Sequence, residues 1–245
     1  MHVHGSTALV TGANRGIGKA FVESLLAAGA KKVYAGARNP ADVTIKGATP
    51  VKLDITNVDQ VARAADQCDD VNVLINNAGI GAPTPFIASP DLRDFKAAMD
   101  TNYFGTLNMC RAFAPILKRN GGGALVNMLS VASWHTPGLI GGYSASKTAA
   151  LALTRGVRIE LRSQGTFVVG VYAGFVDTDM TKNLTVPKVK PEDIAAAVMS
   201  GLAERIEEIL ADERSREIAT NLVRESRIRE EINQTVWDES PYSKQ

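Results

Sequence analysis

The sequence has little cysteine, little net charge and no long apolar run. Only two cysteines occur in 245 residues, Cys68 and Cys110, and neither has a histidine or second cysteine at metal-ligand spacing. This excludes a disulfide framework and gives no metal site, so both are expected as buried thiols in a reducing compartment. The 27 basic residues nearly balance the 26 acidic ones, for a net charge of +1. Because this charge provides no strong field, nucleic acid and anionic membranes are disfavoured as partners.

A membrane span and a secretion signal are also missing from the sequence. Apolar runs stay below the roughly 18 residues that a span needs. The segment 1–7 has no cationic region followed by an apolar stretch. We therefore expect a cytoplasmic protein with no membrane partner.

Apolar runs of strand length alternate with stretches of helical period along the chain. Two of the runs, 71–76 and 167–172, are almost continuously apolar, which is typical of strands buried on both faces. The alternation predicts an α/β fold, a doubly wound parallel sheet with helices on both faces in a single domain. Strands are predicted at 8–11, 32–37, 51–53, 71–76, 124–129 and 167–172, and helices at 17–29, 57–66, 92–118, 143–164 and 191–204.

The C-terminal part has a different character. We assign 1–212 to the dinucleotide-binding and catalytic domain and 213–245 to a charged helix and tail of the same domain. Two readings stay open for this helix: it is solvated, or its narrow apolar stripe covers a subunit contact or the active site. The stripe consists of Ile218, Leu222, Ile228 and Ile232, and the acid-first pairs four residues apart are Asp212 with Arg216 and Glu225 with Arg229.

A glycine-rich turn joins the first predicted strand to the first predicted helix. Residues 8–18 read Ala-Leu-Val-Thr-Gly-Ala-Asn-Arg-Gly-Ile-Gly. Gly12, Gly16 and Gly18 would allow a tight turn, close approach of a pyrophosphate, and close packing of the helix on the strand. The following Lys19-Ala20 does not fit a nucleoside-triphosphate loop. The turn therefore predicts a dinucleotide site of the Rossmann type, and not ATP or GTP binding.

The end of the second strand bears on the choice between NADH and NADPH. A site for NADH usually places a carboxylate there for the ribose 2′-hydroxyl. Here the strand ends Tyr-Ala-Gly-Ala and is followed by Arg38, while Arg15 lies in the glycine turn. Two guanidinium groups can bind a 2′-phosphate through several hydrogen bonds. We predict that NADPH is preferred, the alternative being that both arginines only solvate loops.

Three residues point to chemistry at the same edge of the sheet. Tyr143 and Lys147 are four residues apart on a predicted helix, so their side chains emerge on one face. Ser130 ends the strand 124–129, at the edge where open parallel sheets bind ligands. We expect the three side chains to face the bound dinucleotide.

Together these patterns resemble the short-chain dehydrogenase/reductase family, in its compact single-domain branch. The resemblance extends over about residues 5–205. It rests on Thr11-Gly12-x-x-x-Gly16-x-Gly18, Asn76-Asn77-Ala78-Gly79, Asn102, Ser130 and Tyr143-x-x-x-Lys147.

The resemblance implies a catalytic set of four residues. Tyr143 would protonate the substrate carbonyl while hydride passes from the nicotinamide. Lys147 would lower the phenol pKa from its usual value of about 10 and bind the nicotinamide ribose. Ser130 would hydrogen-bond the carbonyl, and Asn102 would hold a water that links the lysine to solvent.

The resemblance also implies the cofactor contacts. The chain departs from the family where Ala173-Gly174 replaces the usual Pro-Gly, which removes a ring that restrains φ and predicts looser cofactor placement. The implied contacts are Gly12, Asn14, Arg15, Gly16, Ile17, Gly18, Arg38, Asp54, Ile55, Asn77, Ala78, Gly79, Tyr143, Lys147, Gly174, Val176 and Thr178.

The predicted function is that of an NADPH-dependent carbonyl reductase or alcohol dehydrogenase. A short connection over 177–190 predicts an open site that accepts varied ketones or aldehydes. The alternative is a non-catalytic NADPH-sensing regulator that uses the C-terminal helix as an interface. The helices at 92–118 and 143–164 match those through which family members form homodimers and homotetramers. Substrate contacts that suggest an apolar or aromatic compound, with loop packing as the alternative, are Trp134, Leu139, Phe175 and Met180.

Overall fold

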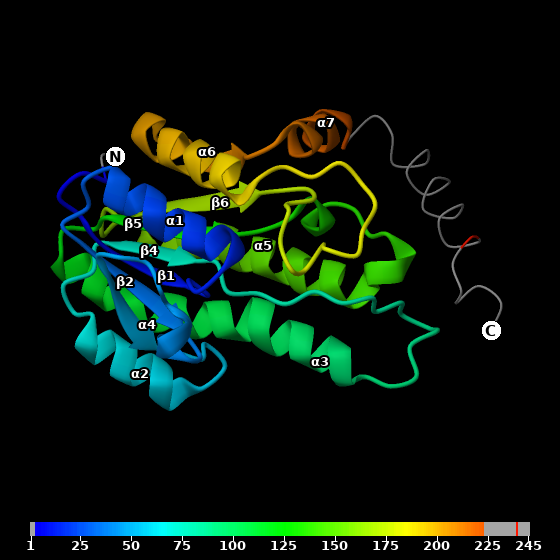
Figure 1. The fold of residues 1–245 in the computed structure, drawn as a ribbon, viewed down its shortest axis with the longest axis horizontal. Coiled ribbons are helices and arrows are strands. Elements are labelled where there is room, and N and C mark those ends of the chain that lie inside the picture. The colour runs from blue at the N-terminus through cyan, green and yellow to red at the C-terminus, as the bar shows by residue number, and fades with distance from the viewer. Residues whose placement is uncertain (1–2, 223–238, 240–245) are drawn as a thin grey trace.

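A seven-stranded parallel sheet forms the centre of the molecule, a computed structural model that describes residues 3–222 and residue 239. The strand order β3-β2-β1-β4-β5-β6-β7 reverses direction between β1 and β4, so the predicted doubly wound sheet is confirmed (Figure 1). The strands are β1 (Thr7–Thr11), β2 (Lys32–Ala37), β3 (Ala48–Lys52), β4 (Val73–Asn76), β5 (Ala124–Met128), β6 (Phe167–Tyr172) and β7 (Glu208–Leu210).

Helices cover both faces of the sheet and bury two apolar cores. Within β1, Ala8 and Val10 belong to one core and Leu9 to the other, because alternate side chains of a strand point to opposite faces. The first core lies under α1 (Gly16–Ala27) and α6 (Pro191–Glu204). The second lies under α2 (Val58–Gln67), α4 (Thr106–Arg119) and α5 (Gly141–Leu161).

The predicted helix over 92–118 is wrong as a single element. The structure has α3 (Arg93–Met99), a π-helical segment (Asp100–Gly105) and then α4. Apolar spacing does not reveal this insertion, which places Asn102 at the centre of the π turn. Such turns are frequent at functional sites.

The edge strand β7 was not expected from the sequence. It is only three residues long and carries a glutamate at its first position, so it lacks the apolar run by which a strand is recognised. It pairs with β6 through Gly170↔Glu208, Val171↔Ile209 and Tyr172↔Leu210. This pairing brings the residues that follow Leu210 to the carboxyl end of the sheet.

The chain after β7 continues into α7 (Glu213–Asn221). The predicted pairing of Asp212 with Arg216 is wrong. The carboxylate of Asp212 accepts the Ser215 N–H instead, and the Arg216 guanidinium donates to the Leu210 carbonyl. Residues Ile228 and Ile232 and the pair Glu225 with Arg229 lie outside the described residues, so the assignment of 213–245 stays a prediction.

Two further features concern burial and membranes. Cys68 and Cys110 are both free and buried, as predicted. Within residues 3–222, no helix has the length and apolarity needed to span a membrane.

Candidate active site

A cavity of about 980 Å³ opens at the carboxyl ends of the central strands. This volume is at the upper end of the range of about 300–1,000 Å³ for ligand sites. All seventeen residues that the resemblance assigns to the cofactor line this cavity, together with Ser130 and Met180. The fold thus brings the two ends of the predicted site into one space, and the contacts themselves stay a prediction.

The glycine turn has a separate steric reason for each glycine. Gly12 and Gly16 have φ angles of +64° and +52°, in the left-handed region that favours glycine. A Cβ at Gly18 would lie 2.1 Å from the Gly12 carbonyl oxygen, so only glycine allows α1 to pack so closely on β1. Among the described residues, no side chain caps the first turn of α1. Its N–H groups are therefore available to an anion, which fits a pyrophosphate.

Thr11 ties the glycine turn to the segment after β4. Its buried hydroxyl oxygen accepts the N–H groups of Asn77 and Ala78, both at 3.0 Å. The Asn77 amide donates back to the Thr11 carbonyl at 2.9 Å. Thr11 was part of the recognised motif but not a predicted site residue, and its role is to hold two strand ends together.

The two predicted phosphate-binding arginines are not equivalent. Arg15 forms an ion pair with Asp179 at 2.8 Å, and both side chains are largely exposed. Arg38 is exposed beside the cavity and has no ion pair within the described part of the chain. Because exposed ion pairs stabilise by about 1 kcal/mol or less, Arg15 can be released at little cost. Of the two, only Arg15 is held by a carboxylate within the described part of the chain.

Lys147 is a buried cation one helical turn after Tyr143. Lys147 is only 7% exposed, and its Nζ donates to the Met128 carbonyl at 2.8 Å. Burial lowers the pKa of Lys147 from 10.5 to about 8. The lysine thus keeps its proton at neutral pH but loses it more readily than an exposed lysine.

The pKa of Tyr143 is raised, which corrects the expectation that Lys147 lowers it. Burial of the phenol is the largest cause, and a hydrogen bond with Ser130 opposes it. The Lys147 ammonium lies 5.9 Å from the Tyr143 ring centroid and is directed to the Met128 carbonyl. Tyr143 therefore holds its proton firmly, as a general acid must before it meets the developing oxyanion.

Ser130 is held at the end of β5. Its hydroxyl accepts the Ala132 N–H at 3.1 Å and donates weakly to the Ala173 carbonyl at 3.5 Å. The Ser130 hydroxyl also opposes the rise in the pKa of Tyr143, and both residues line the cavity. Two adjacent O–H donors can bind one carbonyl oxygen.

Asn102 is buried but does not line the cavity. Its Oδ1 accepts the Ile80 N–H, and its Nδ2 donates to the Ile80 carbonyl and to the Ser146 hydroxyl, all at 2.9 Å. Ile80 does line the cavity. Asn102 therefore shapes the wall after Asn77-Ala78-Gly79 through the Ile80 backbone.

Of the four predicted substrate contacts, only Met180 lines the cavity. Trp134 stacks on Tyr172 with ring centroids 3.9 Å apart. The Phe175 ring lies 4.8 Å below the Arg214 guanidinium, and the Leu139 carbonyl accepts a backbone N–H. The structure thus places these three in loop packing, the alternative stated from the sequence. Apolar lining residues that sequence reasoning missed include Leu53, Met128 and Leu129, which lie at the ends of predicted strands, and Ile80, four residues after the end of β4.

Comparison with known proteins gives matches to a family model, to a curated relative and to solved structures. The family model for short chain dehydrogenases matches residues 6–188. A 3-oxoacyl-(acyl-carrier-protein) reductase from Synechocystis is 34% identical over 215 residues, which cover 78% of this chain and 86% of that protein.

Two solved structures resemble the fold closely. A short chain dehydrogenase from Burkholderia cenocepacia, in complex with NADP, is 41% identical, with a TM-score of 0.90 over 93% of this chain and 97% of that one. A short chain dehydrogenase/reductase from Burkholderia phymatum, in complex with NAD, is 26% identical, with a TM-score of 0.80 over 91% and 93% of the two chains.

Proposed function

The chain belongs to the short-chain dehydrogenase family of oxidoreductases, and from that premise we propose that it is an NADPH-dependent carbonyl reductase or alcohol dehydrogenase. The observation that carries the proposal is one cavity lined at one end by the glycine turn and Arg38 and at the other by Ser130, Tyr143 and Lys147. The same cavity has both an anion-binding end and a proton-donating end.

The proposed mechanism assigns a task to each side chain of the proton-donating end. When bound, the nicotinamide supplies the hydride. Tyr143 donates its phenol proton to the carbonyl oxygen as negative charge develops there. The Ser130 hydroxyl donates a hydrogen bond to the same oxygen. Lys147 stabilises the remaining tyrosinate with its positive charge, and its ammonium group would bind a ribose hydroxyl of the cofactor.

The proposed preference for NADPH is tested at Arg38. Replacing Arg38 by Asp removes a charge-assisted hydrogen bond to a phosphate and adds a repulsive carboxylate. The Kd for NADPH should rise by about ten- to a hundredfold, while the Kd for NADH should fall. Fluorescence titration of both cofactors measures the two constants.

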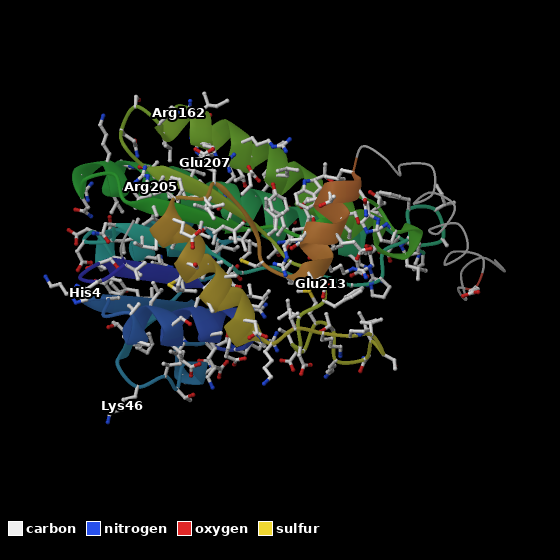
Figure 2. All side chains as sticks on the ribbon, turned by 90° about the horizontal axis from the view of Figure 1, so that it is seen from above. His4, Lys46, Arg162, Arg205, Glu207 and Glu213 are labelled. Carbon is white, nitrogen blue, oxygen red and sulfur yellow. The ribbon has the colours of Figure 1, made fainter. Side chains whose placement is uncertain are left out.

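The matched control for this charge change is Arg162→Asp. Arg162 follows α5 and is exposed (Figure 2), and it does not line the cavity. It should leave both constants within about twofold of wild type, the usual size of a remote surface effect. An unchanged ratio of the two constants in Arg38→Asp would refute the assignment.

Met180 is the proposed apolar contact for the substrate. A Cβ at Gly81 would lie 3.0 Å from the Met180 Sδ and 3.3 Å from the Tyr143 ring, so Met180 lies close to the catalytic phenol. Met180→Ala should raise KM for an aromatic ketone about fivefold through lost apolar contact, with little effect on a small aliphatic ketone. Met180→Leu, which keeps the volume, serves as the control. Equal changes for both ketones would contradict an apolar contact.

The proposal as a whole is tested by following NADPH oxidation, with NADH in parallel, over a panel of aliphatic, aromatic and dicarbonyl compounds. Turnover of a carbonyl compound with NADPH is expected. Tight binding of NADPH without turnover of any compound would instead favour the alternative, a sensing regulator. No observation supports that alternative. The proposal includes a cytoplasmic, even-numbered homo-oligomer, which a sizing experiment tests.

A further inference from the structure

The turn after β6 lacks the proline that usually stiffens it in this family, yet it is tightly held. The Ala173 carbonyl accepts the Val131 N–H at 3.1 Å. The Gly174 N–H donates to Oδ2 of Asp212 at 2.6 Å. Both Ala173 and Gly174 line the cavity, at the end where Ser130 and Tyr143 lie.

Asp212 uses both carboxylate oxygens in this arrangement. Oδ2 accepts the Gly174 N–H, and Oδ1 accepts the Ser215 N–H at 2.7 Å as the cap of α7. Asp212 is buried but does not line the cavity. Hydrogen bonds to an ionised acceptor are roughly twice as strong as neutral ones, so the carboxylate joins the turn firmly to α7.

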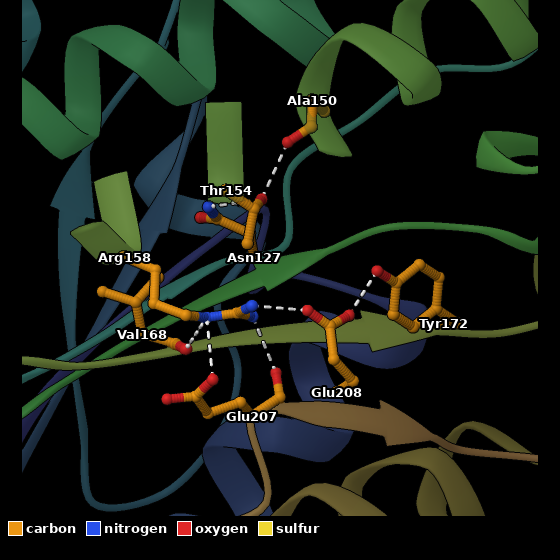
Figure 3. Close-up of polar contacts among 8 residues, drawn as sticks. All are labelled: Asn127, Ala150, Thr154, Arg158, Val168, Tyr172, Glu207 and Glu208. Atoms are coloured by element: carbon orange, nitrogen blue, oxygen red, sulfur yellow. Dashed lines mark hydrogen bonds and ion pairs between the residues drawn. The ribbon is translucent and has the colours of Figure 1, made fainter. Parts of the chain in front are cut away.

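The position of Asp212 depends on the register of β7 against β6. The Arg158 guanidinium donates to Glu208 at 2.5 Å and to the carbonyls of Val168 and Glu207, both at 3.0 Å (Figure 3). The second oxygen of Glu208 accepts the hydroxyl of Tyr172. Since Tyr172 precedes Gly174 by two residues, this network sets Asp212 opposite the turn.

Arg214 encloses the other side of the turn. A Cβ at Gly174 would lie 2.7 Å from the Arg214 Cδ. The Arg214 guanidinium lies 4.8 Å from the Phe175 ring centroid. Arg214 lies in the first turn of α7, whose first residue, Glu213, is labelled in Figure 2.

We propose that Asp212 is a positioning residue that replaces the missing proline ring and holds the Ala173-Gly174 turn beneath the nicotinamide end of the site. This inference rests on the proposed function. Asp212 acts through Gly174, and the restraint comes from the C-terminal edge of the sheet, 38 residues along the chain. The turn is therefore rigid despite the substitution that predicted looseness.

The first test is Asp212→Asn, which keeps the shape of the side chain. Its amide has one oxygen acceptor, so it cannot accept from both the Gly174 N–H and the Ser215 N–H through separate oxygens. Hydrogen–deuterium exchange of the Gly174 amide without cofactor should become about tenfold faster, the effect of losing one hydrogen bond to a charged group. The control Ser215→Ala removes the other half of the cap, since the Ser215 hydroxyl bonds the Asp212 N–H and carbonyl. It should lower Tm but leave Gly174 exchange as in wild type.

The second test measures the consequence for the cofactor. In Asp212→Asn, kcat should fall about tenfold, and the nicotinamide fluorescence of bound NADPH should change. Inhibition by adenosine 2′,5′-bisphosphate, which probes the other end of the site, should stay within about twofold of wild type.

Rescue by proline separates positioning from simple damage. Adding Ala173→Pro to Asp212→Asn restores the ring restraint, and kcat should return to within about threefold of wild type. The Ala173 N–H donates to no acceptor in the described part of the chain, so the substitution removes no hydrogen bond there. Asp212→Ala, measured with and without Ala173→Pro, provides a second pair of variants for the same comparison.

Unchanged Gly174 exchange in Asp212→Asn would overturn the proposal. The proposal would also be overturned if Gly174 exchange became faster in Asp212→Asn while kcat and NADPH fluorescence equalled those of Ser215→Ala. If wild-type protein turns over no carbonyl compound, the proposed function fails. Exchange and NADPH fluorescence still decide the role of Asp212 in that case, because neither needs turnover.

Discussion

Replacing Tyr143 by Phe is expected to lower kcat for carbonyl reduction by about a hundred- to ten-thousandfold, the usual contribution of a general acid. The phenylalanine ring keeps the shape of the phenol but has no proton to donate. Because burial raises the pKa of Tyr143, the wild-type phenol is protonated throughout the neutral range. The loss of rate should therefore be similar from pH 6 to pH 8, as kcat measured across buffers will show.

Binding and folding should change little in Tyr143→Phe. The Kd for NADPH should stay within about threefold, because only one polar atom is removed and Ser130 keeps its bond from Ala132. Tyr103→Phe removes the same atom from the π segment and should keep full activity. Carbonyl reduction by Tyr143→Phe at the wild-type rate would refute the assigned acid.

Replacing Lys147 by Met is expected to abolish most activity while changing how stability depends on pH. The variant loses the charge that balances the tyrosinate, so kcat should fall at least about a hundredfold. The buried amine has a pKa of about 8, against 10.5 for an ordinary lysine. Folding therefore disfavours the protonated form, and the penalty is fully present below pH 8.

The sign of the pH effect follows from proton binding. Between pH 8 and pH 10.5 the unfolded chain still holds a proton that the folded chain has released, so the stability of the wild type rises with pH. The rise attributable to Lys147 is about 3 kcal/mol, at about 1.4 kcal/mol per unit of pKa. In Lys147→Met this part is absent. Urea unfolding of both proteins from pH 7 to pH 10 measures the difference, and parallel curves would contradict a depressed pKa.

Some parts of the molecule follow from short stretches of sequence. The bounds of β6 and α6 agree with the prediction because an unbroken apolar run and Pro191 at the first turn are local signals. The glycine turn was also predictable, since the left-handed φ angles of Gly12 and Gly16 exclude most side chains. Such features are determined by a few neighbouring residues.

The spacing of the proposed catalytic residues is visible in the sequence, but their electrostatics are not. Spacing on a helix placed Tyr143 and Lys147 on one face, and the structure agrees. The direction of the Tyr143 pKa depends on burial by the whole fold, and the Lys147 ammonium is directed to the Met128 carbonyl at the end of β5. No local pattern contains that information.

The sequence by itself therefore determined the doubly wound sheet and the glycine turn, and it predicted the catalytic side chains, because each pattern extends over a few residues or one helical turn. Only the tertiary structure decided which loop residues reach the cavity, that Arg15 pairs with Asp179, and that Asp212 holds the turn at Gly174. The physical reason is that these contacts join residues far apart in the chain. Their partners are chosen by strand order and by the register of a three-residue edge strand that has no sequence signal of its own.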